Sequence, residues 1–156
     1  MSSSSHLTRR KILAGTLISA ALPFASFAQR GRDPDSPKPT DVRMRMSFGD
    51  YAMTATLYDN PSARDFASML PLSLRIEDYG RNEKIVYLPR KLTRIRDEPF
   101  DNERPGDIAY YAPWGNLVFY HSGYRYSKGL IRLGRFDDGF EPLLTRGEYP
   151  LRIEPM

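Results

Sequence analysis

The chain is most constrained by short segments in which apolar and polar residues alternate. At positions 42–48 every second residue is apolar, and the same alternation returns at positions 51–57 after Gly49-Asp50. A period of two is typical of a half-buried β-strand, whose successive side chains point to opposite faces of a sheet. Glycine at the first central position suits the type II′ turn of a hairpin. We therefore predict two antiparallel strands at 42–48 and 51–57, joined by this turn.

Comparable segments continue along the chain and predict a mainly β domain. Segments rich in apolar, β-branched and aromatic residues are separated by Gly, Pro, Asp and Asn, which predicts strands at 72–77, 83–88, 107–112, 117–122, 129–136 and 151–154. Such a series is typical of a barrel or a sandwich. The chain has no cysteine, so its stability has to come from a hydrophobic core, and thiol catalysis and thiolate metal sites are excluded. The charged segment 93–105 is the longest expected loop.

One amphipathic helix is expected between the second and third strands. Asn60 can cap the first free amides, and Pro61 suits the first helical position, where its missing N–H costs nothing. Pro71 ends the pattern. The apolar positions between these prolines follow one helix face, at Ala63, Phe66, Ala67 and Leu70. A helix of about ten residues is marginally stable alone, so we expect it to pack against the sheet.

The first 28 residues have the order of a secretory signal peptide. Three basic residues, at positions 9–11, precede a short apolar run and a small-residue segment that ends at Ala28. The run is too short to span a bilayer, which needs ~20 residues. We expect cleavage after Ala28, export to the periplasm or the exterior of a bacterium, and no stable membrane span afterwards. Residues 29–41 are rich in proline and charge, so we expect a disordered linker before the domain at 42–156.

Residues 8–13 read Thr-Arg-Arg-Lys-Ile-Leu, which resembles the twin-arginine export motif, with departures at Ile12 and Ala14. The export machinery is therefore an expected partner through Arg9 and Arg10, and a general secretory signal is the alternative. The whole chain carries 23 Lys or Arg against 19 Asp or Glu, and cleavage would leave 20 against 19, a formal charge of +1. A nucleic-acid-binding protein needs a basic excess, so nucleic acid is not an expected partner.

An ordered set of short motifs is similar to a known family. The set comprises Ala55-Thr56-Leu57, Asn60-Pro61, Asp65-Phe66, Leu70-Pro71-Leu72, Glu83-Lys84-Ile85, Leu88-Pro89, Pro105-Gly106-Asp107, the run from Tyr110 to Asn116, Gly129-Leu130 and Leu133-Gly134. Together these motifs resemble the small bacterial cyclophilin-like domain proteins, a largely uncharacterised family. The resemblance covers residues 40–140 and implies a closed β-barrel of about eight strands with one α-helix capping an end.

The resemblance does not imply prolyl isomerase activity. True prolyl isomerases of that fold use a Phe-His-Arg stretch, with the Arg reaching the proline amide, and a Gly-Thr-Gly-Gly loop. Neither occurs in this sequence. Since a fold does not determine a function, we expect a binding module rather than an enzyme. A divergent prolyl isomerase acting on exported proteins and a structural or accessory partner protein are the alternatives.

The densest aromatic cluster, at positions 110–116, is the expected ligand-binding site, because aromatic side chains line apolar pockets. Further aromatic residues at positions 119–126 extend it along the following strand and loop. The ligand would be an unknown small molecule or a peptide. The candidate residues are Tyr110, Tyr111, Trp114, Tyr120 and His121. For Trp114, the only tryptophan, the alternative is that it plugs the barrel end as part of the core. Adjacent strand residues face opposite sides, so Phe119 and Tyr120 cannot line one pocket.

His121 is the only histidine after the signal segment. It could act as a general acid or base, but a lone histidine on the apolar face of Leu117 and Phe119 more often belongs to the core. No cofactor or metal site is expected, because Asp137-Asp138 and the acidic residues at 97–101 lack the spacing of a metal-binding loop. We expect Glu83 to be a surface charge at a strand entrance, the alternative being a partner for an arginine inside the barrel end.

Overall fold

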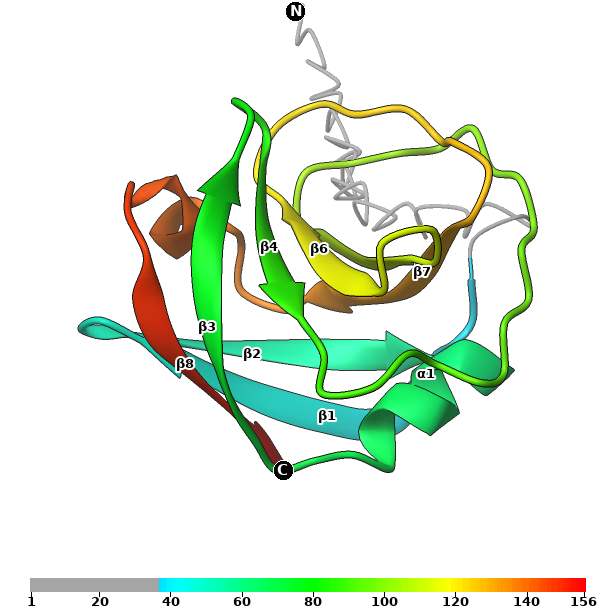
Figure 1. Cartoon of the computed structure of the whole chain (residues 1–156), viewed down its shortest axis with the longest axis horizontal. Helices are drawn as coiled ribbons and strands as arrows, with labels where there is room; N and C mark the ends of the chain where they lie inside the picture. Colours follow the sequence, from blue (N-terminus) through cyan, green and yellow to red (C-terminus); the bar gives the residue numbers. More distant parts are fainter. Residues whose placement is uncertain (1–36) are drawn as a thin grey trace, which may run out of the picture. The chain divides into compact units, whose positions relative to one another are not determined.

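The computed structural model describes residues 37–156, and this part of the chain forms a closed β-barrel. Its eight strands follow the order β1-β2-β7-β5-β6-β4-β3-β8 around the barrel, and neighbouring strands are antiparallel (Figure 1). The strands are β1 Pro39–Phe48, β2 Tyr51–Tyr58, β3 Leu72–Tyr79, β4 Glu83–Tyr87, β5 Asp107–Tyr111, β6 Asn116–Tyr120, β7 Leu130–Phe136 and β8 Tyr149–Pro155. The predicted mainly β barrel with an α-helix is confirmed. The expected signal peptide and residues 29–36 of the expected linker lie outside the described residues.

The first hairpin forms as the alternation predicts. Met46 lies opposite Met53, and Phe48 lies opposite Tyr51, on the antiparallel pair β1 and β2. The turn places Gly49 at a φ of 52°, a left-handed conformation that glycine adopts at little cost. β1 is longer than predicted: it begins at Pro39, inside the segment expected to be a linker. There the Thr40 hydroxyl donates a hydrogen bond of 2.9 Å to a carbonyl of β2.

The barrel interior is filled by the apolar members of the alternating segments. Residues of all eight strands take part, among them Met44, Leu57, Ile76, Val86, Ile108, Leu117, Leu133 and Ile153, each buried. One charged side chain shares this interior. Lys84 of β4 is fully buried, and its ammonium group donates hydrogen bonds to Asp78 at 2.7 Å and to the Gly147 carbonyl at 3.3 Å. Both contacts are needed because an unpaired buried charge is strongly unfavourable.

A second apolar core lies on the outer face of β5 and β6. Its buried members are Ala109, Val118, Tyr120 and Leu130, and the partly buried Phe100, Tyr111, Tyr124 and Tyr126 pack against them. Two loops cover this face, residues 88–106 between β4 and β5 and residues 121–129 between β6 and β7. They contact each other through the Tyr126 hydroxyl, which donates to Asp97 at 2.8 Å. As a result, every residue of β6 is buried.

The helix α1 spans Pro61–Ala67 and ends earlier than predicted. The Asn60 side chain caps it, accepting a hydrogen bond of 2.8 Å from the Ala63 amide. The same side chain donates to the Arg132 carbonyl at 2.9 Å, which fixes the start of α1 against β7. α1 lies at one end of the barrel (Figure 1), and its Phe66 side chain enters the core. No helix within residues 37–156 is long and apolar enough to cross a membrane.

α1 also holds the loop at residues 88–106. The buried carboxylate of Asp65 accepts hydrogen bonds from the Arg90 guanidinium at 2.7 Å, the Thr93 amide at 2.6 Å and the Thr93 hydroxyl at 3.1 Å. Hydrogen bonding, first of all from Arg90, holds the pKa of Asp65 well below its usual range. One carboxylate therefore positions the loop that covers the second core.

Candidate functional site

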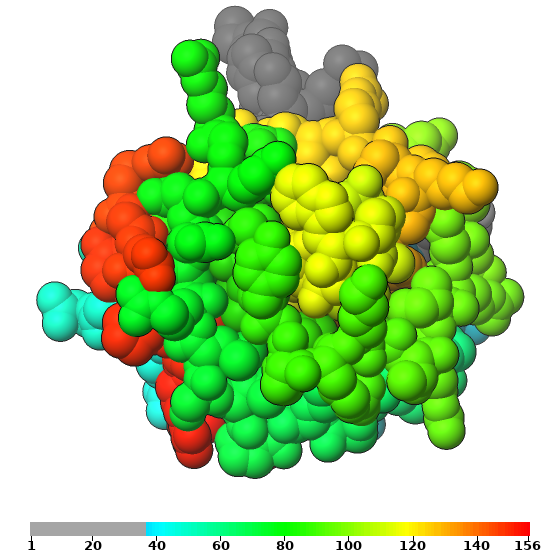
Figure 2. All heavy atoms as spheres, in the orientation of Figure 1, coloured from blue at the N-terminus to red at the C-terminus, as the bar shows by residue number. Residues whose placement is uncertain are grey.

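A pocket of about 250 Å³ opens on the outer face of the barrel, beside the second core. Its walls come from five strands, the β5–β6 turn and the loop at 121–129. On the face shown in Figure 2, the turn between β5 and β6 (yellow) lies exposed next to β3 and β4 (green). We call this the aromatic pocket. It is lined by Tyr79, Glu83, Tyr111, Trp114, Asn116, Val118, Tyr120, Ser127 and Leu130.

Trp114 forms the exposed rim of the aromatic pocket. The indole meets the ring of Tyr79 at 5.3 Å between centroids and 87° between planes, and the ring of Tyr111 at 5.7 Å and 73°. These edge-to-face contacts are favourable and fix the ring orientations. Trp114 nevertheless stays 46% exposed. The alternative in which this side chain plugs the barrel end is therefore wrong.

The turn that carries Trp114 is held from two sides. Within the turn, the amides of Trp114 and Gly115 donate to the Tyr111 carbonyl at 3.2 Å and 2.8 Å. Across it, the Ala112 amide donates to the Gly129 carbonyl at 2.8 Å. Gly129 adopts a φ of +88°, and a Cβ atom there would lie 2.8 Å from the ring of Pro113. The rim of the pocket is thus preorganised by backbone contacts.

Glu83 is the acidic residue of the aromatic pocket. It begins β4 and lies opposite Tyr120 in the β4–β6 register. The residue is half-buried, and within residues 37–156 its carboxylate has no ion pair and no hydrogen bond. Burial raises the pKa of Glu83 to about 7, because an apolar environment disfavours the charged form. Glu83 is therefore neither the exposed charge nor the arginine partner expected from the sequence.

Tyr120 forms the inner wall of the pocket and is fixed by its neighbours. Its ring stacks on that of Tyr124, with centroids 3.5 Å apart and 4° between planes. The Tyr124 hydroxyl donates to Asp107 at 2.7 Å, and Asp107 also pairs with Arg135 at 2.6 Å. Burial is the main cause that raises the pKa of both tyrosines, so both hydroxyls stay protonated at neutral pH. Phe119 points into the barrel core, opposite to Tyr120, as the alternation predicts.

The remaining two candidates lie elsewhere. Tyr110 belongs to the barrel core, where its hydroxyl accepts a hydrogen bond of 3.2 Å from the Leu92 amide. His121 does not line the aromatic pocket; its electrostatic neighbours are Lys84, Arg146 and Asp78. Burial, followed by the charges of Lys84 and Arg146, lowers the pKa of His121. Its buried Nε2 atom has no hydrogen-bond partner among the described residues. The structure therefore brings together Tyr111, Trp114 and Tyr120, without Tyr110 or His121.

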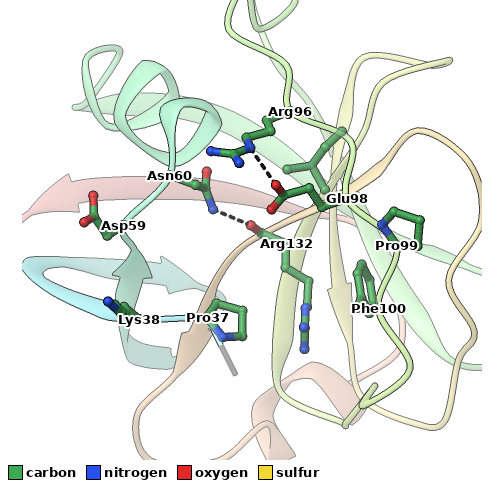
Figure 3. A pocket seen from close by; sticks show the side chains of 10 residues that line it. Pro37, Lys38, Asp59, Asn60, Arg96, Glu98, Pro99, Phe100 and Arg132 are labelled. Atoms are coloured by element: carbon green, nitrogen blue, oxygen red, sulfur yellow. Dashed lines mark hydrogen bonds and ion pairs between the residues drawn. The ribbon is translucent and has the colours of Figure 1, made fainter. Parts of the chain in front are cut away.

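A second pocket, of about 200 Å³, lies between the start of α1 and the loop at 88–106. Figure 3 shows the Arg132 side chain running alongside the ring of Phe100, over which its guanidinium lies at 4.1 Å. Three other charges of this pocket have partners of their own, since Arg96 pairs with Glu98 at 2.6 Å and Asp59 pairs with Arg64. Mixed charges that neutralise one another favour a solvated surface. The aromatic pocket is the better candidate site. No group of three metal-ligating side chains occurs in residues 37–156.

Sequence reasoning missed the members of the pocket that come from distant strands. Tyr79 ends β3, and Glu83 lies opposite it on β4. Ser127 and Leu130 enter from the loop and the start of β7. The short turn at Gly80 between Tyr79 and Glu83 was the available signal, because it makes the two residues cross-strand neighbours. Their approach to Trp114 depends on the pairing of β4 with β6, which alternation alone does not specify.

Comparison with known proteins agrees with this architecture. The sequence profile of the cyclophilin-like family matches residues 46–154. No curated protein matches the sequence. Among solved structures, the chain is similar to the solution structure of the hypothetical protein AF2241 from Archaeoglobus fulgidus, with a TM-score of 0.56 and 15% sequence identity. The similarity covers 78% of this chain and 98% of that chain. At this level of identity, the likeness shows the fold alone.

Proposed function

This chain belongs to the cyclophilin-like family, and from that premise we propose that its barrel is a binding module. The aromatic pocket would take a small ligand or one side chain of a peptide. The observation that carries this proposal is Trp114, an indole held in place by two other rings yet 46% exposed at the mouth of a pocket. Exposed aromatic groups that are already ordered bind with little loss of conformational freedom.

The lining of the pocket favours binding over isomerisation. Aromatic and apolar residues supply most of the wall, and Glu83, Asn116 and Ser127 supply a few polar groups, which is the usual composition of a ligand site. None of the lining residues is an arginine or a lysine. The lining of the described pocket thus offers no cation that could polarise a prolyl amide.

The fluorescence of Trp114 provides a direct test, because it is the only tryptophan of the chain. We would titrate the protein with proline-containing tetrapeptides and follow indole emission, and follow peptide cis/trans exchange by NMR on the same samples. We expect binding without accelerated exchange. Accelerated exchange would contradict the proposal and favour a prolyl isomerase. An unchanged emission and unchanged peptide signals would remove these peptides as ligands.

The variant Trp114→Ala separates a binding role from a structural one. We expect it to weaken ligand binding by about 2 kcal/mol or more, the range of interface hot spots, with little change in unfolding free energy. Binding would be measured by NMR line shifts of the ligand, since the variant lacks the fluorophore. The control is Tyr87→Ala, which removes an aromatic side chain that is 52% exposed and does not line the pocket. A stability loss of about 3–5 kcal/mol with unchanged binding would instead show that Trp114 has a structural role.

We also propose that the protein is exported before it acts. The support is the charged, apolar and small-residue order of positions 8–28 and the arginine pair at Arg9 and Arg10. In a bacterial host, the double variant Arg9→Lys/Arg10→Lys should accumulate uncleaved in the cytoplasmic fraction, since the twin-arginine route requires the pair. Unchanged export of this variant would indicate the general secretory route, and retention of the unaltered protein would contradict export.

A further inference from the structure

We infer that the aromatic pocket selects a ligand with a cationic group, either a small amine or the ammonium or guanidinium group of a peptide side chain. The inference rests on the proposal that this pocket binds a ligand, and it specifies the chemistry of that ligand. Two independent features of the pocket support it. One is the arrangement of its aromatic walls, and the other is the half-burial of its single carboxylate, that of Glu83.

The aromatic walls have the composition of a cation-binding cage. Tyr79, Tyr111 and Trp114 meet at steep angles, 87° and 73° between ring planes, so the three rings cannot lie in one flat layer. The faces of aromatic rings carry partial negative charge and attract cations, with tryptophan the strongest. Rings held at steep angles around a cavity can surround a compact charged group.

Glu83 supplies a carboxylate that has no counter-ion among the residues that the structure describes. Several carboxylates that the fold withdraws from solvent are paired, among them Asp65 with Arg90 at 2.7 Å and Asp107 with Arg135 at 2.6 Å. Asp78 likewise pairs with buried Lys84 at 2.7 Å. Glu83 has no such partner within residues 37–156. A half-buried carboxylate is unfavourable unless it is paired or protonated, and a cationic ligand would supply the missing charge.

The electrostatics of the pocket disfavour anionic and neutral ligands relative to a cation. No basic side chain lines it, and no basic group offsets the burial that raises the pKa of Glu83 to about 7. The Glu83 carboxylate would repel an anionic ligand, and no basic side chain of the pocket lining would offset that repulsion. A neutral ligand would bury Glu83 further without pairing it. A cation favours the ionised form, so its affinity should rise as the pH increases from 6 to 8.

Three probes of similar size and different charge test this inference: benzyltrimethylammonium, benzyl alcohol and phenylacetate. Each would be titrated into the protein, with Trp114 fluorescence and backbone amide shifts as readouts. We expect the cation to bind at least ten-fold more tightly than the alcohol, and phenylacetate to bind most weakly. Glu83→Gln should remove most of the affinity advantage of the cation over benzyl alcohol, together with the pH dependence of cation binding. Glu154→Gln is the control, because it removes an exposed carboxylate of β8 outside the pocket.

The outcomes distinguish the inference from the proposed function. Equal affinity for benzyltrimethylammonium and benzyl alcohol, both shifting pocket signals, would overturn the cation preference and leave a binding module. If no probe or peptide shifts the signals of the pocket residues, the proposed function is overturned as well. To identify the source of the cation, a tetrapeptide with a central arginine would be compared with the same peptide carrying glutamine. Tighter binding of the arginine peptide than of benzyltrimethylammonium would favour a peptide ligand, and the reverse would favour a small amine.

Discussion

Gly134 in β7 shows how one residue decides whether two strands can meet. It lies opposite Leu57 where β7 pairs with β2. A Cβ atom at position 134 would overlap the carbonyl oxygen of Thr56 and lie 3.0 Å from the Cα atom of Leu57. The obstacle is backbone rather than a flexible side chain, so the strand itself would have to move. Glycine is therefore required here by close approach of the neighbouring backbone.

We predict that Gly134→Ala destabilises the barrel by about 1–3 kcal/mol, the usual cost of overpacking. Urea unfolding followed by circular dichroism would measure the loss. The matched control is Gly123→Ala, because an added Cβ atom there meets nothing within 4 Å. Equal unfolding midpoints for the two variants would contradict the close approach of β2 and β7.

At the scale of elements, α1 and the loop at 88–106 depend on each other. α1 has seven residues, and a helix of that length is not stable alone. The loop contains no strand of its own, and together with residues 121–129 it covers the second core. Asp65 joins the two, with hydrogen bonds to Arg90 and Thr93 on the loop. The same helix that closes one end of the barrel thus also holds the cover of the outer face.

We predict that Asp65→Asn lowers the unfolding free energy at pH 7 by about 1.5–3 kcal/mol, the range for hydrogen bonds to a charged group. Because the folded pKa of Asp65 is depressed, the unfolded chain binds more protons in acid. This contribution is present above the unfolded pKa of about 3.9 and is lost as the pH falls below it. The difference between the two proteins should therefore shrink between pH 7 and pH 3.

Chemical unfolding at several pH values would measure this effect. Asp59→Asn serves as the control, since Asp59 forms an exposed ion pair with Arg64, and exposed pairs contribute about 0–1 kcal/mol. If the loss from Asp65→Asn stayed constant down to pH 3, the loop would not depend on the ionised carboxylate. Faster hydrogen exchange in residues 88–106 of the variant would locate the effect in the loop.

For the whole molecule, the sheet separates two cores, and the aromatic pocket lies at the margin of the outer one. β6 is buried on both faces, so polarity alone does not show which of its residues face away from the barrel interior. The loops that cover β5 and β6 complete the outer core and, through Ser127, also form part of the pocket wall. Stability and the shape of the candidate site are therefore coupled through the same two loops.

The sequence predicts local structure better than it predicts the site. Alternation within one segment is enough to predict β1, β2 and the hairpin between them, and the Asn60-Pro61 pair is enough to predict where α1 begins. The same alternation places the adjacent residues Tyr110 and Tyr111 on opposite faces of β5, although the aromatic cluster predicts both in one binding site. The meeting of Tyr79 and Glu83 with Trp114 depends on strand order and register, which are set by long-range packing. The burial of Lys84 inside the barrel is equally hard to predict from the sequence, because its partner Asp78 belongs to another strand, β3.

The closure of the barrel has a consequence for how a peptide can be recognised. Each described strand has a hydrogen-bonded neighbour on both sides, so its backbone amides and carbonyls are largely occupied. A peptide therefore has no free edge on which to add itself as a further strand, the mode in which main-chain hydrogen bonds supply affinity. The barrel would then recognise a single peptide side chain inserted into the aromatic pocket, and the peptide residues on either side of it could vary. A peptide ligand of this barrel would be defined by one residue rather than by an extended motif.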